Sequence, residues 1–170
     1  VKESLIHAAG AHDVAVNIRW IHSEAVAAEG AEAVLGDVDG IVVPGGFGER
    51  GVEGKVDAAR YARLNNVPYL GLCLGLQVMV IEFARSLFES DEPNSTEFDA
   101  ETAYPVISLM DEQRRVVDKG GTMRLGSYPC TLRPGTKARE VYGVDEAVER
   151  HRHRYEFNNE YREQFEAAGL

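Results

Sequence analysis

The sequence is poor in basic charge and has no long apolar stretch. Its 170 residues carry 18 Lys and Arg against 28 Asp and Glu. Because nucleic-acid affinity depends on cations that neutralise phosphates, this balance argues against a nucleic-acid partner. The longest apolar region, residues 67–81, is interrupted by Pro68, Gly71, Gly75 and Gln77, and a membrane span needs about 20 apolar residues. Both a nucleic-acid-binding protein and a membrane protein are therefore disfavoured.

Cysteine is scarce as well. Cys73 and Cys130 lie far apart and outside any Cys-x-x-Cys spacing, which argues against a disulfide framework and against a metal site. The chain opens at Val1 without a basic segment followed by an apolar signal, so we expect a cytoplasmic protein. Because it also ends in helical composition at Leu170, we expect it to be a fragment of a longer polypeptide.

Apolar runs alternate with helical periodicity through the first half of the chain. The pattern predicts strands over residues 14–21, 38–44 and 67–72, and helices over 4–9, 23–35, 52–65 and 74–88. This alternation favours a parallel sheet covered by helices on both faces. The second half predicts antiparallel hairpins and then a short helix, over 104–109, 123–132 and 159–168. The sequence thus predicts one α/β domain over residues 1–170 with an added antiparallel portion.

One segment combines a strand, a cysteine and a helix start. An apolar strand enters Gly71-Leu72-Cys73-Leu74-Gly75, after which the helical pattern begins. This is the cysteine form of a nucleophile elbow, in which small residues flank the nucleophile because larger ones would collide in the tight turn. The positive end of the helix then favours a thiolate. An ordinary buried cysteine is the common alternative, and Cys130, which lacks this setting, is assigned to that alternative.

A thiolate that attacks a carbonyl creates an oxyanion, which needs backbone N–H groups directed at it. The glycine loop, residues 44–48, follows the neighbouring predicted strand and is placed to supply one such group. The N–H of Leu74 is placed to supply the other. A glycine cluster alone usually indicates a plain tight turn, so the loop gains meaning only from the elbow beside it.

The glycine loop Pro44-Gly45-Gly46-Phe47-Gly48 and the segment Gly71–Gln77 together resemble the class I (triad) glutamine amidotransferases. Further segments resemble the glutaminase domains of CTP synthases in particular: Glu53-Gly54-Lys55, Asn94–Asp99, Gly120–Gly126 and Arg150–Glu156. The resemblance covers nearly the whole chain. It implies a flavodoxin-like three-layer α/β/α fold with a mostly parallel sheet. It also implies hydrolysis of glutamine to glutamate and ammonia, which a synthetase domain uses with ATP and Mg²⁺ to convert UTP to CTP.

The resemblance also implies roles for single residues. Cys73 would be the nucleophile that forms a glutamyl thioester, and Gly46 and Leu74 would serve the oxyanion. Glu97 would bind the α-amino group of glutamine, and Arg154 its α-carboxylate. The residues lining the glutamine pocket would be Gly46, Leu74, Gly75, Leu76 and Gln77.

Two of these assignments depend on the resemblance alone. Without it, Glu97 is a solvated loop acid, and the Arg150–Tyr155 run is a basic surface patch. Nothing in the spacing of that run selects Arg154 over Arg152.

The family completes its site with a His-x-Glu pair downstream of the Arg150–Glu156 segment, but no histidine follows His153. We therefore expect a glutaminase domain truncated before its general base, with the synthetase domain lying before Val1. Two other functions stay open: another hydrolase with an elbow cysteine, and a catalytically silent domain with a docking or regulatory role.

The resemblance names GTP as an allosteric activator and a tetramer as the assembly of the full protein. Phe47 and Arg50 lie on or just beyond the glycine loop, where an aromatic face can stack a base and a cation can meet an anion. The alternative is that Phe47 caps the core and Arg50 is solvated. No cofactor is expected within residues 1–170 themselves.

Overall fold

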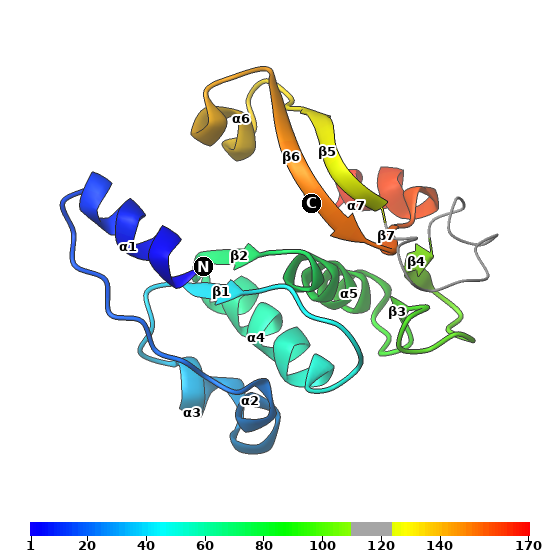
Figure 1. The fold of residues 1–170 in the computed structure, drawn as a ribbon. Coiled ribbons are helices and arrows are strands. Elements are labelled where there is room, and N and C mark those ends of the chain that lie inside the picture. The colour runs from blue at the N-terminus through cyan, green and yellow to red at the C-terminus, as the bar shows by residue number, and fades with distance from the viewer. Residues whose placement is uncertain (110–123) are drawn as a thin grey trace. The chain divides into compact units, whose positions relative to one another are not determined.

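The computed structural model describes residues 1–109 and 124–170, which mix helices with parallel and antiparallel strands (Figure 1). They fold as two compact units: Val1–Ile107 with Phe157–Leu170, and Ser108–Glu156. Within the described residues, no helix is long and apolar enough to cross a membrane.

The first unit begins with three short helices: α1 (Lys2–Ala11), α2 (Ser23–Glu29) and α3 (Ala31–Leu35). The sequence predicted a single helix over residues 23–35. The break falls at Gly30, which adopts φ +91°, a conformation that interrupts helical hydrogen bonding and that glycine tolerates best. The composition therefore indicated the helical segment correctly and missed its interruption.

Residues 14–21 form neither a helix nor a strand, so the strand predicted there is wrong. Their alternating apolar side chains are exposed, at 59% for Val14, 42% for Val16 and 72% for Trp20. Alternation yields a strand only where a neighbouring strand supplies hydrogen-bond partners. Among the described residues, no strand pairs with this segment.

The parallel pair of the first unit is β1 (Ile41–Val43) and β2 (Tyr69–Gly71), with Ile41 opposite Tyr69 and Val43 opposite Gly71. Parallel strands need a crossover, and α4 (Val52–Asn65) provides it. Both strands end at the same edge, so the segments that follow them start side by side. Helix α5 (Leu74–Phe88) leaves this edge directly after β2.

Helices α4 and α5 have the bounds that their periodicity predicted, residues 52–65 and 74–88. Their apolar faces pack together and supply several fully buried side chains, including Val56, Val78 and Ile81. The buried carboxylate of Glu82 on α5 accepts from Arg63 on α4, from Nε at 2.9 Å and from Nη2 at 2.7 Å. This ion pair satisfies a charge that would otherwise be costly to bury.

After α5 the chain forms β3 (Asn94–Ser95), which pairs in parallel with β4 (Pro105–Leu109). The chain returns to the first unit through β7 (Tyr155–Phe157), a 3₁₀ turn (Asn159–Tyr161) and α7 (Arg162–Ala167). Phe165 of α7 is buried and contacts Phe83 of α5 edge to face, with ring centres 5.5 Å apart. This aromatic contact seats the last helix on α5.

The second unit is built on an antiparallel pair, β5 (Arg124–Thr131) and β6 (Glu146–His153), with α6 (Lys137–Tyr142) between them (Figure 1). This pair confirms the antiparallel portion predicted for this half. Residues 104–109 were also predicted to belong to antiparallel hairpins, and this is wrong for their pairing with β3, because β4 runs parallel to that strand. Of the Gly120–Gly126 motif, residues 120–123 lie outside the described part of the chain.

Candidate active site

Cys73 lies in the turn between β2 and α5, where it caps the N-terminus of the helix. Its backbone adopts φ +55° and ψ −107°, and a positive φ in a residue with a Cβ stores about 1–3 kcal/mol of strain. The side chain is exposed. A strained turn that presents one side chain at a helix start is the geometry of a nucleophile elbow.

The flanking glycines are required by space. A Cβ at position 71 would lie 2.5 Å from the carbonyl carbon and oxygen of Gly75, and a Cβ at position 75 would lie 2.0 Å from the carbonyl oxygen of Val43. Both distances are far below any contact that real side chains make. The collision predicted from the sequence is therefore confirmed at both positions.

Tyr69 stabilises the same turn, a role that was not predicted from the sequence. Its hydroxyl donates a hydrogen bond of 2.9 Å to the carbonyl oxygen of Gly75. Burial raises the pKa of this phenol well above its ordinary value. The available signal was its position two residues before Gly71, although nothing in that spacing shows which way the ring points.

The glycine loop lies directly against the elbow. The N–H of Leu72 donates to the carbonyl of Val43 at 2.9 Å, which aligns the two strand ends. A Cβ at position 45 would lie 3.3 Å from Cβ and 3.9 Å from Sγ of Cys73. A Cβ at position 46 would lie 3.2 Å from Cδ2 of Leu74. As the first residue of α5, Leu74 has an N–H with no acceptor inside the helix.

Glu97 reaches the glycine loop from a segment far along the chain. The N–H of Gly48 donates to Glu97 Oε1 at 3.2 Å. The acid is held by its surroundings, because its own N–H donates to Oγ of the fully buried Ser95 at 3.1 Å. The N–H of Thr96 donates to the carbonyl of Ile107 at 3.0 Å. Glu97 is thus a fixed neighbour of the loop beside Cys73.

The remaining residues proposed from the sequence for the glutamine pocket lie in the first turn of α5. Leu74 and Gly75 are buried, while 49% of Leu76 is exposed. Gln77 is nearly buried, and its N–H donates to the carbonyl of Cys73 at 3.1 Å. The structure therefore brings the elbow, the glycine loop and Glu97 into one neighbourhood.

A family model for class-I glutamine amidotransferases matches residues 1–170. The chain belongs to this family. It is 61% identical over 171 residues to the CTP synthase of Roseiflexus sp. (strain RS-1), and 57% identical over 170 residues to that of Chloroflexus aurantiacus (strain J-10-fl). Each alignment includes the whole of this chain, which spans 31% of the length of these CTP synthases.

The fold of this amidotransferase chain is shared with a solved structure. It is similar to the glutaminase domain of Trypanosoma brucei CTPS with bound acivicin, at a TM-score of 0.85 and 41% identity. The match covers 96% of this chain and 63% of the other. The predicted α/β fold class is thereby confirmed, and the chain is similar over its length to the glutaminase part of CTP synthases.

Phe47 and Arg50 of the amidotransferase are both on the surface. Phe47 is 63% exposed, so it does not cap the core as the alternative held. The guanidinium Nε of Arg50 donates to Glu24 Oε1 at 2.6 Å, and this pair is solvent-exposed. Exposed ion pairs of this kind contribute little to stability and exchange partners readily.

Within the second unit, the structure distinguishes two arginines that sequence spacing left equivalent. Arg152 lies on β6 and is exposed. Arg154 follows the strand and is half-buried, and its Nε is buried with no hydrogen-bond partner among the residues that the structure describes. A buried guanidinium N–H without an acceptor is unusual. The same strand brings His151 Nδ1 within 2.9 Å of His153 Nε2.

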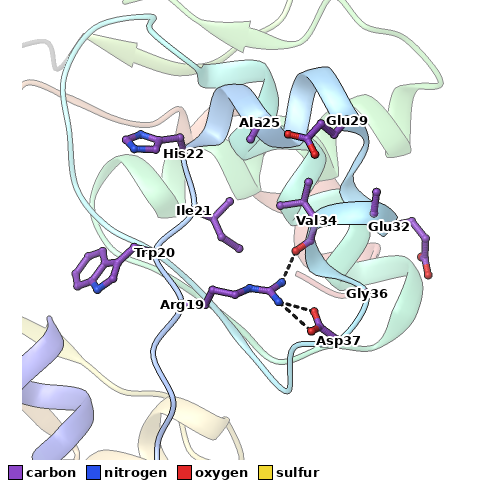
Figure 2. Close-up of a pocket in the computed structure, with 11 residues that line it drawn as sticks. Arg19, Trp20, Ile21, His22, Ala25, Glu29, Glu32, Val34, Gly36 and Asp37 are labelled. Carbon is purple, nitrogen blue, oxygen red and sulfur yellow. Dashed lines mark hydrogen bonds and ion pairs between the residues drawn. The ribbon is translucent and has the colours of Figure 1, made fainter.

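A separate surface cavity of about 580 Å³ is lined by residues 19–22 and by α2 and α3 (Figure 2). Its Arg19 binds the carboxylate of Asp37 at 2.8 Å and the carbonyl of Val34. None of the site residues predicted from the sequence lines this cavity. The described residues also contain no group of three or more His, Cys, Asp or Glu placed to hold a metal ion.

Proposed function

We propose that the chain is the glutaminase domain of a CTP synthase and that it hydrolyses glutamine to glutamate and ammonia. The observation that carries this proposal is the strained, exposed Cys73 at the start of α5, with the glycine loop so near that a Cβ at position 45 would lie 3.9 Å from its sulfur. The similarity to CTP synthases over the whole chain supports the choice of glutamine as substrate.

In the proposed reaction, the thiolate of Cys73 attacks the side-chain carboxamide carbon of glutamine. A carbon–sulfur bond forms and the carbonyl oxygen becomes an oxyanion. The carbon–nitrogen bond then breaks, and the nitrogen takes a proton and leaves as ammonia. Water hydrolyses the resulting glutamyl thioester to glutamate and restores the thiol.

We assign stabilisation of the oxyanion to the N–H groups of Gly46 and Leu74. Leu74 supports this assignment because it is the first residue of α5, where a backbone N–H has no acceptor inside the helix. Gly46 supports it because position 46 packs against the Leu74 side chain. Removing one such donor typically reduces the rate about 100- to 1,000-fold.

For substrate recognition we assign the α-amino group of glutamine to Glu97 and the α-carboxylate to Arg154. Glu97 is held beside the glycine loop by the 3.2 Å bond from Gly48. Arg154 is preferred to Arg152 because its Nε is buried and meets no acceptor within residues 1–109 and 124–170, whereas Arg152 is exposed. Gly75, Leu76 and Gln77 complete the proposed pocket from the first turn of α5.

The proposal needs a general base, which the resemblance places in a His-x-Glu pair downstream of residue 156. Residues 154–170 contain no histidine. In the full protein the ammonia would pass to a synthetase domain that converts UTP to CTP with ATP and Mg²⁺. We further propose a cytoplasmic homotetramer for that protein. The two unpaired cysteines are consistent with a reducing compartment.

We also propose that GTP activates the glutaminase through Phe47 and Arg50. The exposed ring of Phe47 is free to stack a base, and Arg50 is held by an exposed pair that an anion can displace. Phe47 lies on the glycine loop and Arg50 lies just beyond it. A ligand that orders these two residues would therefore also order the proposed oxyanion site, a coupling typically worth about 1–3 kcal/mol. Phe47→Ala in the natural polypeptide should abolish GTP stimulation of the glutamine reaction and leave the ammonia-dependent rate unchanged. Normal stimulation would contradict this assignment.

The test of the function is glutamate release by the natural polypeptide that carries this chain. Wild-type protein should release glutamate from glutamine and form CTP from UTP with either glutamine or ammonia. Cys73→Ser should lose both glutamine-dependent activities and keep ammonia-dependent CTP synthesis. Glutamate release that persists at the wild-type rate in Cys73→Ser would disprove the proposed role of the elbow.

A further inference from the structure

Arg85 is a nearly buried arginine on α5, with only 8% of its surface exposed. Its Nη1 and Nη2 donate to Oε2 and Oε1 of Glu53 at 2.6 and 3.1 Å, and its Nε donates to the carbonyl of Pro93 at 3.1 Å. A guanidinium presents its donors in a rigid planar fork. One side chain therefore fixes the first turn of α4 and the segment before β3 relative to each other.

Its two partners belong to the two segments that meet at the candidate active site. Glu53 lies in the first turn of α4, a few residues after the glycine loop, and Pro93 immediately precedes residues 94–97, which include Glu97. The same two segments meet again where Gly48 donates to Glu97. They are thus joined at two points, once through Arg85 and once directly at the loop.

Burial makes residues 93–97 rigid between the contact with Arg85 and the side chain of Glu97. Pro93 and Ser95 are fully buried, and Ser95 Oγ accepts from the N–H of Glu97 at 3.1 Å. A shift at Pro93 therefore carries through a packed segment to Glu97. Loss of the Arg85 donor would also leave the Pro93 carbonyl without that partner, which favours such a shift.

We propose that Arg85 is a positioning residue for glutamine binding: by bridging Glu53 and the Pro93 carbonyl, it holds Glu97 beside the glycine loop. This inference rests on the proposed function, in which Glu97 receives the α-amino group of glutamine. Arg85 acts through residues 93–97. Its loss weakens substrate binding and spares the chemistry at Cys73, because the elbow and α5 are held by their own contacts.

The test is Arg85→Lys in the natural polypeptide, assayed with glutamine and with ammonia. Lysine keeps a positive charge near Glu53 and lacks the fork that binds the Pro93 carbonyl. A misplacement of about 1 Å costs up to roughly 100-fold, and we expect KM for glutamine to rise about tenfold with kcat within about twofold of wild type. Ammonia-dependent synthesis should stay unchanged, and a kcat near the wild-type value with glutamine would show that the variant glutaminase is folded.

Arg63→Lys is the matched control, because Arg63 also joins α4 to α5 through a carboxylate, that of Glu82. We expect it to leave KM within about twofold of wild type. Glu53→Gln keeps the hydrogen bond from Arg85 to the Pro93 carbonyl. Because the Glu53 side chain is 62% exposed, its ion pair with Arg85 is screened by solvent, and we expect KM for glutamine to rise only about two- to threefold.

Amide hydrogen exchange over residues 94–97 provides a readout that does not need activity. Exchange should be faster in Arg85→Lys than in Arg63→Lys. The inference is overturned if the two lysine variants raise KM alike, if kcat falls while KM stays constant, or if exchange over this segment is unchanged. A wild-type protein that releases no glutamate would overturn the proposed function instead, and the exchange measurement would still report on the bridge.

Discussion

The elbow and the β5–β6 hairpin each carry one free cysteine, and both thiols are exposed. Their backbones differ. Cys130 is one residue of a regular antiparallel ladder, where it lies opposite Ala147. Cys73 occupies a strained turn at the start of α5, with a glycine loop against its sulfur. Exposure therefore does not distinguish the two thiols, and our proposal that Cys73 is the nucleophile rests on its local backbone and surroundings.

The largest expected effect tests this contrast directly. A glutamine analogue that alkylates thiols should label Cys73 and leave Cys130 unlabelled, with a rate difference on the order of 1,000-fold or more. Peptide mapping by mass spectrometry after timed exposure measures the two rates. Cys130→Ala serves as the control and should not change the labelling of Cys73. Label found mainly on Cys130 would reverse the comparison.

The next effect concerns substrate recognition, which we assign to Glu97 and Arg154. In the natural polypeptide, Glu97→Ala and Arg154→Ala should each raise KM for glutamine by roughly 30-fold to several thousand-fold, because each leaves a charged group of the substrate unpaired. Arg152→Ala should have little effect, since Arg152 is exposed on β6. Steady-state kinetics with glutamine separate an effect on KM from an effect on kcat, and the ammonia-dependent rate is the control for the synthetase reaction. If Arg152→Ala proved the more damaging, the assignment to Arg154 would be wrong.

Glycine substitutions separate constraints of space from those of conformation. Gly75→Ala places a Cβ 2.0 Å from the Val43 carbonyl oxygen, and we expect a loss of about 3 kcal/mol in the free energy of unfolding from overpacking. Gly126→Ala in the hairpin meets open space but must adopt φ +116°, and we expect a loss of about 1 kcal/mol. Denaturant titration measures both. Equal losses would show that the elbow is no more crowded than the hairpin.

The smallest effect concerns Tyr69, whose hydroxyl donates to the Gly75 carbonyl. At neutral pH, Tyr69→Phe should cost about 1 kcal/mol of unfolding free energy, the usual contribution of one hydrogen bond. Burial raises the pKa of Tyr69 above its ordinary value of 10.0, so the unfolded chain loses this proton first. Its contribution is complete below pH 10 and is lost as pH rises further.

The measurement for Tyr69 is the unfolding free energy of wild type and Tyr69→Phe between pH 7 and about pH 11. The difference between the two proteins should narrow above pH 10. A constant difference across this range would show that the phenol keeps the same pKa in the folded and unfolded chains.

Much of the fold near the elbow followed from local patterns. The bounds of α4 and α5 were predicted to the residue because helical periodicity acts over a few turns. The prediction that larger residues on either side of Cys73 would collide in the turn is confirmed. The strand expected over residues 14–21 was wrong, since apolar alternation records a preference and not the presence of a neighbouring strand.

The sequence by itself determined that a cysteine would stand in a tight turn between a strand and a helix, because the turn is built from adjacent residues. Only the tertiary structure decided that the loop N–H of Gly48 meets Glu97, that Arg85 ties Glu53 to Pro93, and which arginine of the basic run is half-buried. Such contacts join residues far apart in the chain. Their formation depends on the loop entropy and packing of the whole unit, which no local pattern records.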